Sequence, residues 1–219
     1  MTRALFALMT LTTISLAKAP LPLLLTEDFE KGAKRWEPID PATWKILKTE
    51  KGNVYNQFKN ASKKTHAKHR SPHNIALLKD IVVGDFIFDA KVQSTKKDYP
   101  HRDMRLFFGF QDRAHFYYVH FGKRTDNHAN QIFIVNNAPR TKISTKTSKG
   151  THWDDEWHCV RITRDVKSGS IRVFFDDMTK PVMTATDKTF TWGRVGIGSF
   201  DENGNWEDIK LYGIKASRK

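Results

Sequence analysis

The sequence predicts an all-β protein, a sandwich or barrel built as one domain from short strands. Three observations lead to that prediction. Apolar and polar residues alternate in short runs, these runs recur roughly every ten residues, and turn signals rich in Gly, Asn, Asp and Ser separate them. Aromatic residues make up 12% of the chain, which suits pleated, half-buried strands, and almost no segment has a helical period.

The expected strands follow Glu27 in regular order. They cover residues 44–50, 74–80, 85–95, 104–110, 116–122, 130–136, 158–165, 170–177, 181–187, 194–200 and 206–214. Turns are expected between strands at 51–53, 83–85, 167–169 and 202–204, where Gly lies beside polar residues. The basic segment 59–70 is expected to be a long exposed loop. No repeat or linker divides the chain.

The N-terminus predicts a signal peptide over residues 1–19. Arg3 precedes an apolar run at 4–16, and small residues at 17–19 offer a cleavage site, with cleavage after Ala17 as an alternative because Pro20 follows. The other interpretation is an uncleaved anchor, although the run is shorter than the roughly 18 residues of a membrane span. We therefore expect a secreted, periplasmic or cell-surface protein with no span after removal of the signal.

The charge of the chain indicates which partners to expect. The formal net charge is +13, and removal of Arg3 and Lys18 with the signal leaves +11. Such a surface suits an anionic polysaccharide, an anionic membrane or nucleic acid, or it is merely solvated. No nucleic-acid partner is expected, because no helix-turn-helix, zinc-finger or RNP pattern is present. Cys159 is the only cysteine, so no disulfide forms within the chain, and a near-core position is expected for it.

The segment DMRLFFGFQDRAHFYYVHFG (103–122) predicts a β-hairpin whose loop is 111–114. Antiparallel pairing outward from that loop gives one apolar side and one polar side. The expected apolar pairs are Phe110–His115, Phe108–Tyr117, Leu106–Val119 and Met104–Phe121. The expected pairs on the other side are Phe107–Tyr118, Arg105–His120 and Asp103–Gly122. A shift of one residue would bury the charges, so the alternation fixes the register.

Residues 154–213 contain an ordered set of features. They are a Trp-His strand, a Ser-Gly turn, a strand ending in Phe-Asp-Asp, the run Gly-x-Val-Gly-Ile-Gly and a closing Glu-Asp-Ile-Lys-Leu. Together with EDFEKGAKRWEP (27–38), this order resembles the laminin-G-like, concanavalin A-like jelly rolls over residues 26–214. Among them it is most similar to the 3-keto-disaccharide hydrolase family. The resemblance implies one domain, 26–214, folded as a two-sheet antiparallel β-sandwich.

The resemblance also implies a carbohydrate-active protein, but it leaves the activity open. The superfamily includes glycoside hydrolases, polysaccharide lyases, lectins and binding modules, so the fold does not decide among them. The Glu-x-Asp-x-x-Glu strand of laminarinase-type hydrolases is absent. The segment NQIFIVN (130–136) also lacks the Gln-x-His motif of the alginate-lyase-type jelly rolls.

In such a jelly roll, the polar side of the hairpin is expected on the concave sheet. His120 is the candidate general base or acid, Tyr118 the proton donor to a leaving oxygen, and Arg105 the bidentate partner of a carboxylate or sulfate. Asp103 is the acid of this group. Elimination on a uronate would use the base, the acid and the arginine, whereas hydrolysis needs two acids about 5–10 Å apart. A satisfied polar face, glycan binding without turnover and catalysis all stay open.

Other residues near the hairpin are expected to contact the glycan. Phe107 would form a platform with Tyr118, and loops 122–131 and 136–145 would rim the same face. The expected substrate-binding residues are Phe107, His101, Arg124, Asn130, Gln131, Arg140 and Lys142. Trp153 and Trp206, in polar turn contexts, are further candidate sugar platforms.

No cofactor is expected for the chemistry, but a structural calcium ion is a further expectation. Many of the jelly rolls that the chain resembles bind calcium between the first and last strands. The matching oxygen donors are Asp28, Glu30 and Asp208, and the alternative is that these are surface carboxylates at strand ends.

The combined prediction is a secreted, monomeric protein that acts on an anionic polysaccharide or oligosaccharide. It would cleave the glycan as a glycoside hydrolase or a polysaccharide lyase. The alternative is a non-catalytic carbohydrate-binding or adhesion module.

Overall fold

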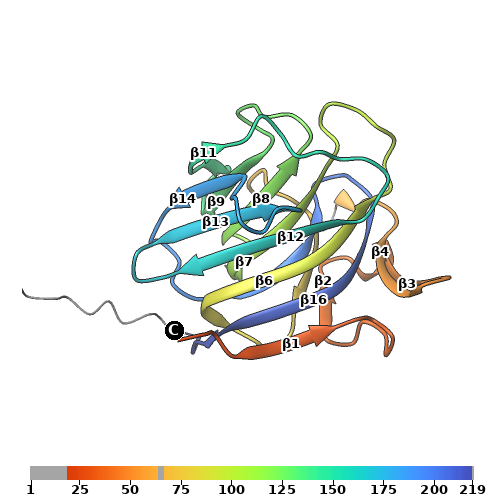
Figure 1. Ribbon diagram of the computed structural model, residues 1–219, viewed down its shortest axis with the longest axis horizontal. Coiled ribbons are helices and arrows are strands. Elements are labelled where there is room, and N and C mark those ends of the chain that lie inside the picture. The colour runs from red at the N-terminus through yellow and green to blue at the C-terminus, as the bar shows by residue number, and fades with distance from the viewer. Residues whose placement is uncertain (1–18, 64–66, 219) are drawn as a thin grey trace, which may run out of the picture.

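The computed structural model describes residues 19–63 and 67–218, so all of the predicted signal peptide but Ala19 lies outside the described residues. The strands of these residues form two antiparallel sheets, which confirms the predicted all-β sandwich (Figure 1). The segment Pro41–Thr43 forms a single 3₁₀ turn, η1. Within residues 19–63 and 67–218, no helix is long and apolar enough to cross a bilayer.

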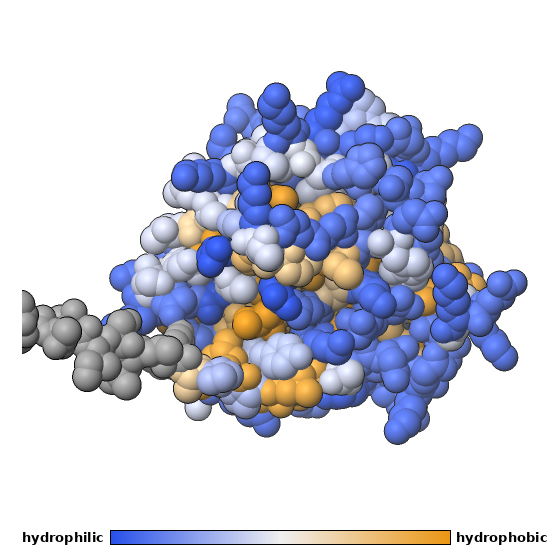
Figure 2. All heavy atoms as spheres, viewed as in Figure 1, coloured by the Kyte–Doolittle hydropathy of each residue, from blue (hydrophilic) through white to orange (hydrophobic). Residues whose placement is uncertain are grey.

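The larger sheet has nine strands in the described part of the chain and lies in front in Figure 1. Its order is β11 (Ser144–Thr147), β14 (Met183–Thr186), β13 (Ser170–Phe175), β12 (His158–Asp165), β6 (Val83–Ser94), β16 (Gly204–Lys215), β4 (Gly52–Gln57) and β3 (Trp44–Thr49), with β1 (Leu23–Glu27) also paired to β16. Charged and polar side chains cover most of the side seen in Figure 2, and a small apolar patch lies over β1.

The smaller sheet has seven strands in the same described ranges. Its order is β10 (Thr141–Lys142), β9 (Gln131–Asn136), β8 (His115–Gly122), β7 (Asp103–Asp112), β15 (Arg194–Ser199), β5 (Asn74–Leu78) and β2 (Trp36–Pro38). The hairpin predicted from the sequence therefore forms the centre of this sheet as β7 and β8.

The main hydrophobic core fills the space between the two sheets. From the hairpin it receives Met104, Leu106, Phe108, Tyr117, Val119 and Phe121, as the alternation predicts. The sheets meet through aromatic contacts, such as Phe86 with Phe108 at 5.8 Å between ring centroids. Full burial of each such ring stabilises the fold by about 1.5–3 kcal/mol.

The predicted register of the hairpin is confirmed from Asp103 to Phe108 but not at its tip. Asp103, Arg105 and Phe107 lie opposite Gly122, His120 and Tyr118, whereas His115 pairs with Asp112 instead of Phe110. A bulge causes the difference, because Gly109 adopts φ 54°, a conformation that other residues rarely enter. The bulge turns Phe110 to the outer face of the sheet.

That outer face carries a second apolar cluster, which the alternation alone did not indicate. It consists of Ile75, Leu77, Phe107, Phe110, Phe116, Tyr118, Phe133 and Val135, with Ile39 packed against it. The seven-stranded sheet is therefore covered on both faces, and little of its central surface is open to water.

The other sequence predictions have mixed outcomes. Every predicted strand overlaps an observed one, but residues 83–85, predicted as a turn, begin β6. The list of expected strands lacked β1, β2, β4, β10 and β11. In segment 59–70, Lys63, Lys68 and Arg70 are exposed as expected, whereas Ala61 is buried. Residues 64–66 lie outside the described residues.

Candidate functional site

Three neighbouring strands bring the predicted polar residues together on the outer face of the seven-stranded sheet. Arg105 of β7 lies opposite His120 of β8, and His120 lies opposite Gln131 of β9. Asp103 precedes Arg105 by two residues and so points to the same face. We call Asp103, Arg105 and His120 the Asp103 cluster.

Asp103 links the two basic side chains of this cluster. Its Oδ1 lies 2.9 Å from Arg105 Nη1, and its Oδ2 lies 2.9 Å from His120 Nε2. Arg105 Nη2 also lies 3.2 Å from His120 Nδ1. None of the three residues exposes more than 4% of its surface, so the cluster is a buried network whose charges are paired internally.

Burial and pairing determine the charge states of this cluster. Burial, followed by the Arg105 guanidinium, lowers the pKa of His120 to about 4, so the imidazole is neutral near pH 7. Burial alone would raise the pKa of the Asp103 carboxyl, but Arg105 and His120 outweigh it and hold that pKa below its usual value. At neutral pH the cluster is thus a carboxylate, a guanidinium and a neutral imidazole.

Tyr118 lies beside the cluster and is fully buried. Arg140 Nη1 donates a hydrogen bond of 2.9 Å to the Tyr118 hydroxyl, and the same guanidinium lies 4.8 Å from the centroid of the Phe133 ring. Burial raises the pKa of Tyr118 to about 12, against the opposing effect of Arg140. Phe107 is also fully buried, so Phe107 and Tyr118 do not form the open stacking platform expected from the sequence.

The surface above the Asp103 cluster is formed by Phe200, which directly follows β15. Its half-buried ring lies 5.2 Å from the Arg105 guanidinium, 5.3 Å from that of Arg140 and 5.7 Å from that of Arg70. His73 meets the same ring edge-on at 5.2 Å. We call Arg70, His73, Arg140 and Phe200 the Phe200 patch.

The remaining predicted binding residues are divided between surface and interior. His101, Arg124 and Lys142 are exposed, with His101 Nε2 3.4 Å from Asp126 Oδ2 and Lys142 bonded to the Asn127 side chain. Asn130 and Gln131 are buried, and their amide groups bond to loop atoms between residues 125 and 148. The amide nitrogens of these two residues position the loop, and Asn130 Oδ1 is buried without a hydrogen-bond partner among the described residues.

Sequence reasoning missed a second acid near the cluster. Glu202 is 1% exposed, and its Oε1 accepts a hydrogen bond from the Tyr99 hydroxyl. Burial, with a further contribution from Asp103, raises the pKa of Glu202 to about 7. Glu202 and Phe200 lie on the same turn after β15. The only sequence signal for this turn was the Glu-Asn-Gly at 202–204, which predicts a turn but no partner.

The three predicted calcium ligands are engaged elsewhere. Asp28 accepts from the Glu30 amide, Glu30 accepts from the Asn53 amide, and Asp208 is paired with Lys210 at 3.1 Å and with Lys91 at 3.5 Å. Within residues 19–63 and 67–218, no group of three or more acidic, His or Cys side chains could hold a metal ion. These residues do not fit a calcium site as they stand, and calcium stays a prediction.

Three further expectations concern single side chains. Trp153 and Trp206 are buried, so neither is a sugar platform. The Trp153 indole donates to the Phe121 carbonyl. Cys159 is exposed instead of near-core, because its side chain points to the outer side of β12.

The geometry above defines the class of this protein as a two-sheet jelly-roll β-sandwich of the concanavalin A-like type. The carbohydrate-binding module CBM66 from Bacillus subtilis matches with a TM-score of 0.58 and 13% identity, over 82% of this chain and 96% of that one. Domain 4 of AbnA, a GH43 extracellular arabinanase from Geobacillus stearothermophilus solved with arabinotriose, matches with a TM-score of 0.58 and 8% identity, over 91% and 96%. The metal-free lectin I-B4 from Griffonia simplicifolia matches with a TM-score of 0.52 and 12% identity, over 85% and 97%.

At these identities the similarity establishes the fold alone. Comparison of the sequence with protein-family models and with curated proteins finds no match. The finer resemblance to the 3-keto-disaccharide hydrolase family therefore stays a prediction.

Proposed function

We propose that this protein is a carbohydrate-binding β-sandwich that holds an anionic glycan on the Phe200 patch. One observation carries the proposal. Among the described residues, the guanidinium groups of Arg70, Arg105 and Arg140 surround the Phe200 ring, and Asp103 is the carboxylate directly paired with one of them. Arginine binds carboxylate and sulfate groups bidentately, and an aromatic ring supports the C–H face of a sugar.

The net charge and the fold support this proposal. The chain is strongly basic, which favours an anionic partner. Structurally similar chains include a carbohydrate-binding module, a lectin and a domain solved with arabinotriose. We propose an extracellular setting for the same reasons and because residues 1–19 have the pattern of a signal peptide.

Binding is favoured over cleavage because the proposed acid and base are enclosed. His120 and Tyr118 expose at most 4% of their surface, and Phe200 lies above the Asp103 cluster. A general base must come within hydrogen-bond reach of the proton that it removes. In this arrangement the Asp103 cluster holds Arg105 beneath the patch and thereby supports the surface arginines.

Glycoside hydrolysis is the second candidate, and one observation favours it. Glu202 has a pKa raised to about 7 while the pKa of nearby Asp103 is lowered, so one carboxyl is protonated and the other ionised near neutrality. In glycosidases, two carboxyl groups whose pKa values differ in this way act as the general acid and the general base. Both carboxyls are buried, so this function requires the side chains that cover them to move.

The test combines binding and turnover on one panel of neutral and anionic polysaccharides. Binding is measured by calorimetry, reducing ends by a colour reaction, and unsaturated uronates by absorbance near 235 nm. Arg70→Gln and Arg140→Gln are each expected to weaken binding of the anionic glycan by about tenfold. Arg172→Gln is the matched control, because Arg172 also lies over a ring, Phe174 at 5.3 Å, but on the other sheet.

The two candidate functions predict different results. Binding without new reducing ends or absorbance supports the binding module. Turnover that is lost in Glu202→Gln supports hydrolysis instead. Equal binding of neutral and anionic glycans, or no loss in either arginine variant, would refute the proposed site.

A further inference from the structure

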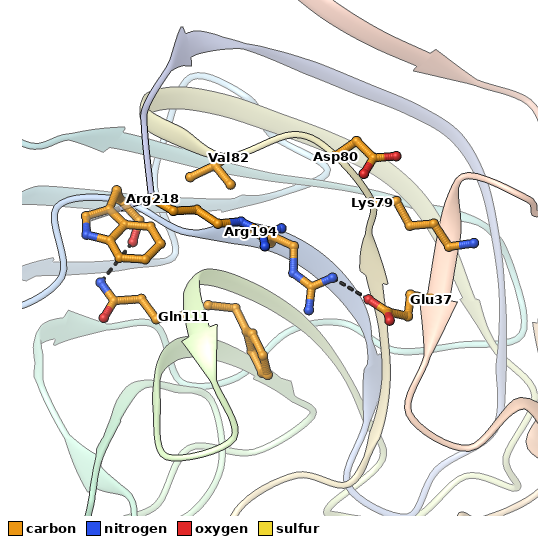
Figure 3. Close-up of a pocket in the computed structure, with 9 residues that line it drawn as sticks. Glu37, Lys79, Asp80, Val82, Gln111, Arg194 and Arg218 are labelled. Carbon is orange, nitrogen blue, oxygen red and sulfur yellow. Dashed lines mark hydrogen bonds and ion pairs between the residues drawn. The ribbon is translucent and has the colours of Figure 1, made fainter.

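A pocket outside the Phe200 patch lies where β2, β7 and β15 come together at the other end of the seven-stranded sheet. It encloses about 410 Å³ and is lined by Glu37, Lys79, Asp80, Val82, Phe110, Gln111, Trp192, Arg194 and Arg218 (Figure 3). A second hollow of about 470 Å³ shares Glu37, Phe110, Gln111 and Arg194 with it and continues toward Leu77 and Arg113. These volumes are in the range of pockets that hold small ligands.

Arg194 occupies the middle of this pocket. Its Nη1 donates to Glu37 Oε2, and its guanidinium lies 5.8 Å from the centroid of the Phe110 ring. In Figure 3 the guanidinium points toward Glu37, while Lys79, Asp80 and Arg218 surround the pair. Within the described residues, Glu37 is the hydrogen-bond partner of Arg194, so the rest of its donor edge is available to a ligand.

The charges in the pocket favour an anion. Lys79, Arg194 and Arg218 are three cations, against the two carboxylates of Glu37 and Asp80. The hydrogen bond from Arg194, with the charges of Lys79 and Arg218, holds the pKa of the Glu37 carboxyl below its usual value despite partial burial. Glu37 is therefore an ionised, exposed carboxylate of the same chain that already occupies one edge of the Arg194 guanidinium.

Groups for recognising a sugar lie around the same arginine. The half-buried Trp192 lines the pocket, and Gln111 Nε2 donates 3.3 Å to the Trp192 carbonyl, which leaves Gln111 Oε1 as an acceptor. Exposed Asp80 supplies further acceptor oxygens. An indole packs against sugar C–H groups, and carboxylate or amide oxygens accept from hydroxyls.

We propose that the Arg194 pocket binds a sugar acid, a pyranose that carries a carboxylate. The carboxylate pairs with Arg194 and with Lys79 or Arg218. The hydroxyls donate to Asp80 and to Gln111 Oε1, and the ring lies against Trp192. This pocket shares no residue with the Phe200 patch, since Arg194 begins β15 whereas Phe200 follows its end.

The test is a ¹H–¹⁵N NMR titration of the whole chain with three probes: methyl glucuronide, methyl glucoside and acetate. Methyl glucuronide is expected to bind most tightly and to shift the side-chain signals of Trp192 and Gln111. Arg194→Gln is expected to weaken it by about tenfold or more, because a charge-assisted pair is lost. Glu37→Gln keeps the hydrogen bond but removes the competing charge, so binding is expected to tighten by about threefold to tenfold.

The opposite signs of these two variants separate the proposal from simple unfolding, which would weaken binding in both. Arg172→Gln serves as the control, and thermal denaturation checks the fold of each variant. Equal affinity for the glucoside would show that the carboxylate is not recognised, and equal affinity for acetate would show that the sugar is not. Either result, or unchanged binding in Arg194→Gln, overturns the proposal. The Phe200 patch is tested with polysaccharides and with other variants, so either proposal can be refuted without affecting the other.

Discussion

Glu202 is expected to make the protein less stable as the pH rises toward 7. Its side chain is 1% exposed, and Tyr99 donates to Oε1, whereas Oε2 has no hydrogen-bond donor among the described residues. Burial, with a contribution from Asp103, raises its pKa from 4.5 to about 7. Glu202→Gln keeps the shape and the acceptor for Tyr99 but removes the titrating charge.

The magnitude follows from proton linkage. Between pH 4.5 and about 7 the folded protein holds a proton on Glu202 that the unfolded chain has released, so the free energy of unfolding falls as the pH rises through this window. Each pKa unit corresponds to about 1.4 kcal/mol, which gives a loss of about 2–3 kcal/mol by pH 8. The free energy of unfolding of Glu202→Gln is expected to equal that of the wild type near pH 4.5. At pH 8 it is expected to be higher than that of the wild type by about 2–3 kcal/mol.

The titration of His120 changes stability with pH in the opposite direction, so the comparison must remove its contribution. Its folded pKa of about 4 lies below the usual 6.5, so its contribution to stability is present above pH 6.5 and is lost as the pH falls toward 4. The difference between wild type and Glu202→Gln removes this term, because His120 is present in both proteins.

The assay is urea unfolding followed by tryptophan fluorescence at pH 5, 6, 7 and 8. The exposed Glu156 offers a matched control, since Glu156→Gln removes the same charge without changing a buried group. If the stability difference between wild type and Glu202→Gln is the same at pH 5 and pH 8, the account of Glu202 is refuted.

Three further predictions concern the fold around the site. Asp103→Asn leaves Arg105 buried without its counter-charge, so the free energy of unfolding should fall by about 3–5 kcal/mol in urea; a loss under 1 kcal/mol would contradict the pairing. Gly193→Ala should prevent stable folding, because the added Cβ would lie 2.2 Å from the Gly109 carbonyl carbon, and an unchanged melting temperature would rule this out. The imidazole of His120 should titrate by NMR with a midpoint near pH 4, and a midpoint near 6.5 would show that it is solvated.

Local alternation was sufficient to predict the hairpin at the centre of the fold. Successive residues of β7 and β8 face opposite sides, so the pairs 105/120 and 107/118 follow from the sequence alone. The pairing at the tip of the hairpin could not be predicted in this way, because the left-handed conformation of Gly109 shifts the register and turns Phe110 outward. A glycine within a strand signals such a bulge, but it does not say on which side the next residue will lie.

The environment of the predicted site could not be derived from the hairpin. Whether Arg105 faces water depends on Phe200, which is far away in the sequence and reaches Arg105 through the pairing of β15 with β7. Arg70 and Arg140 arrive from two further loops. The topology of the fold determines such contacts, so they cannot be predicted from the alternation of residues within one segment.

The same side chains thus acquire a different role once their surroundings are known. On an open sheet, an arginine, a histidine and an aspartate together would be free to act on a substrate, and the pKa of the histidine would remain useful near neutrality. Here the aspartate neutralises one buried charge and the imidazole is neutral, so the cluster carries no uncompensated charge. The cations without a direct carboxylate partner among the described residues lie further out, at Arg70 and Arg140. At the start of β15, Arg194 is paired with Glu37, and Lys79 and Arg218 leave the pocket with one more cation than carboxylate. Positive surface groups beside aromatic rings at both ends of one strand are the reason for proposing that the protein binds an anionic glycan and does not cleave it.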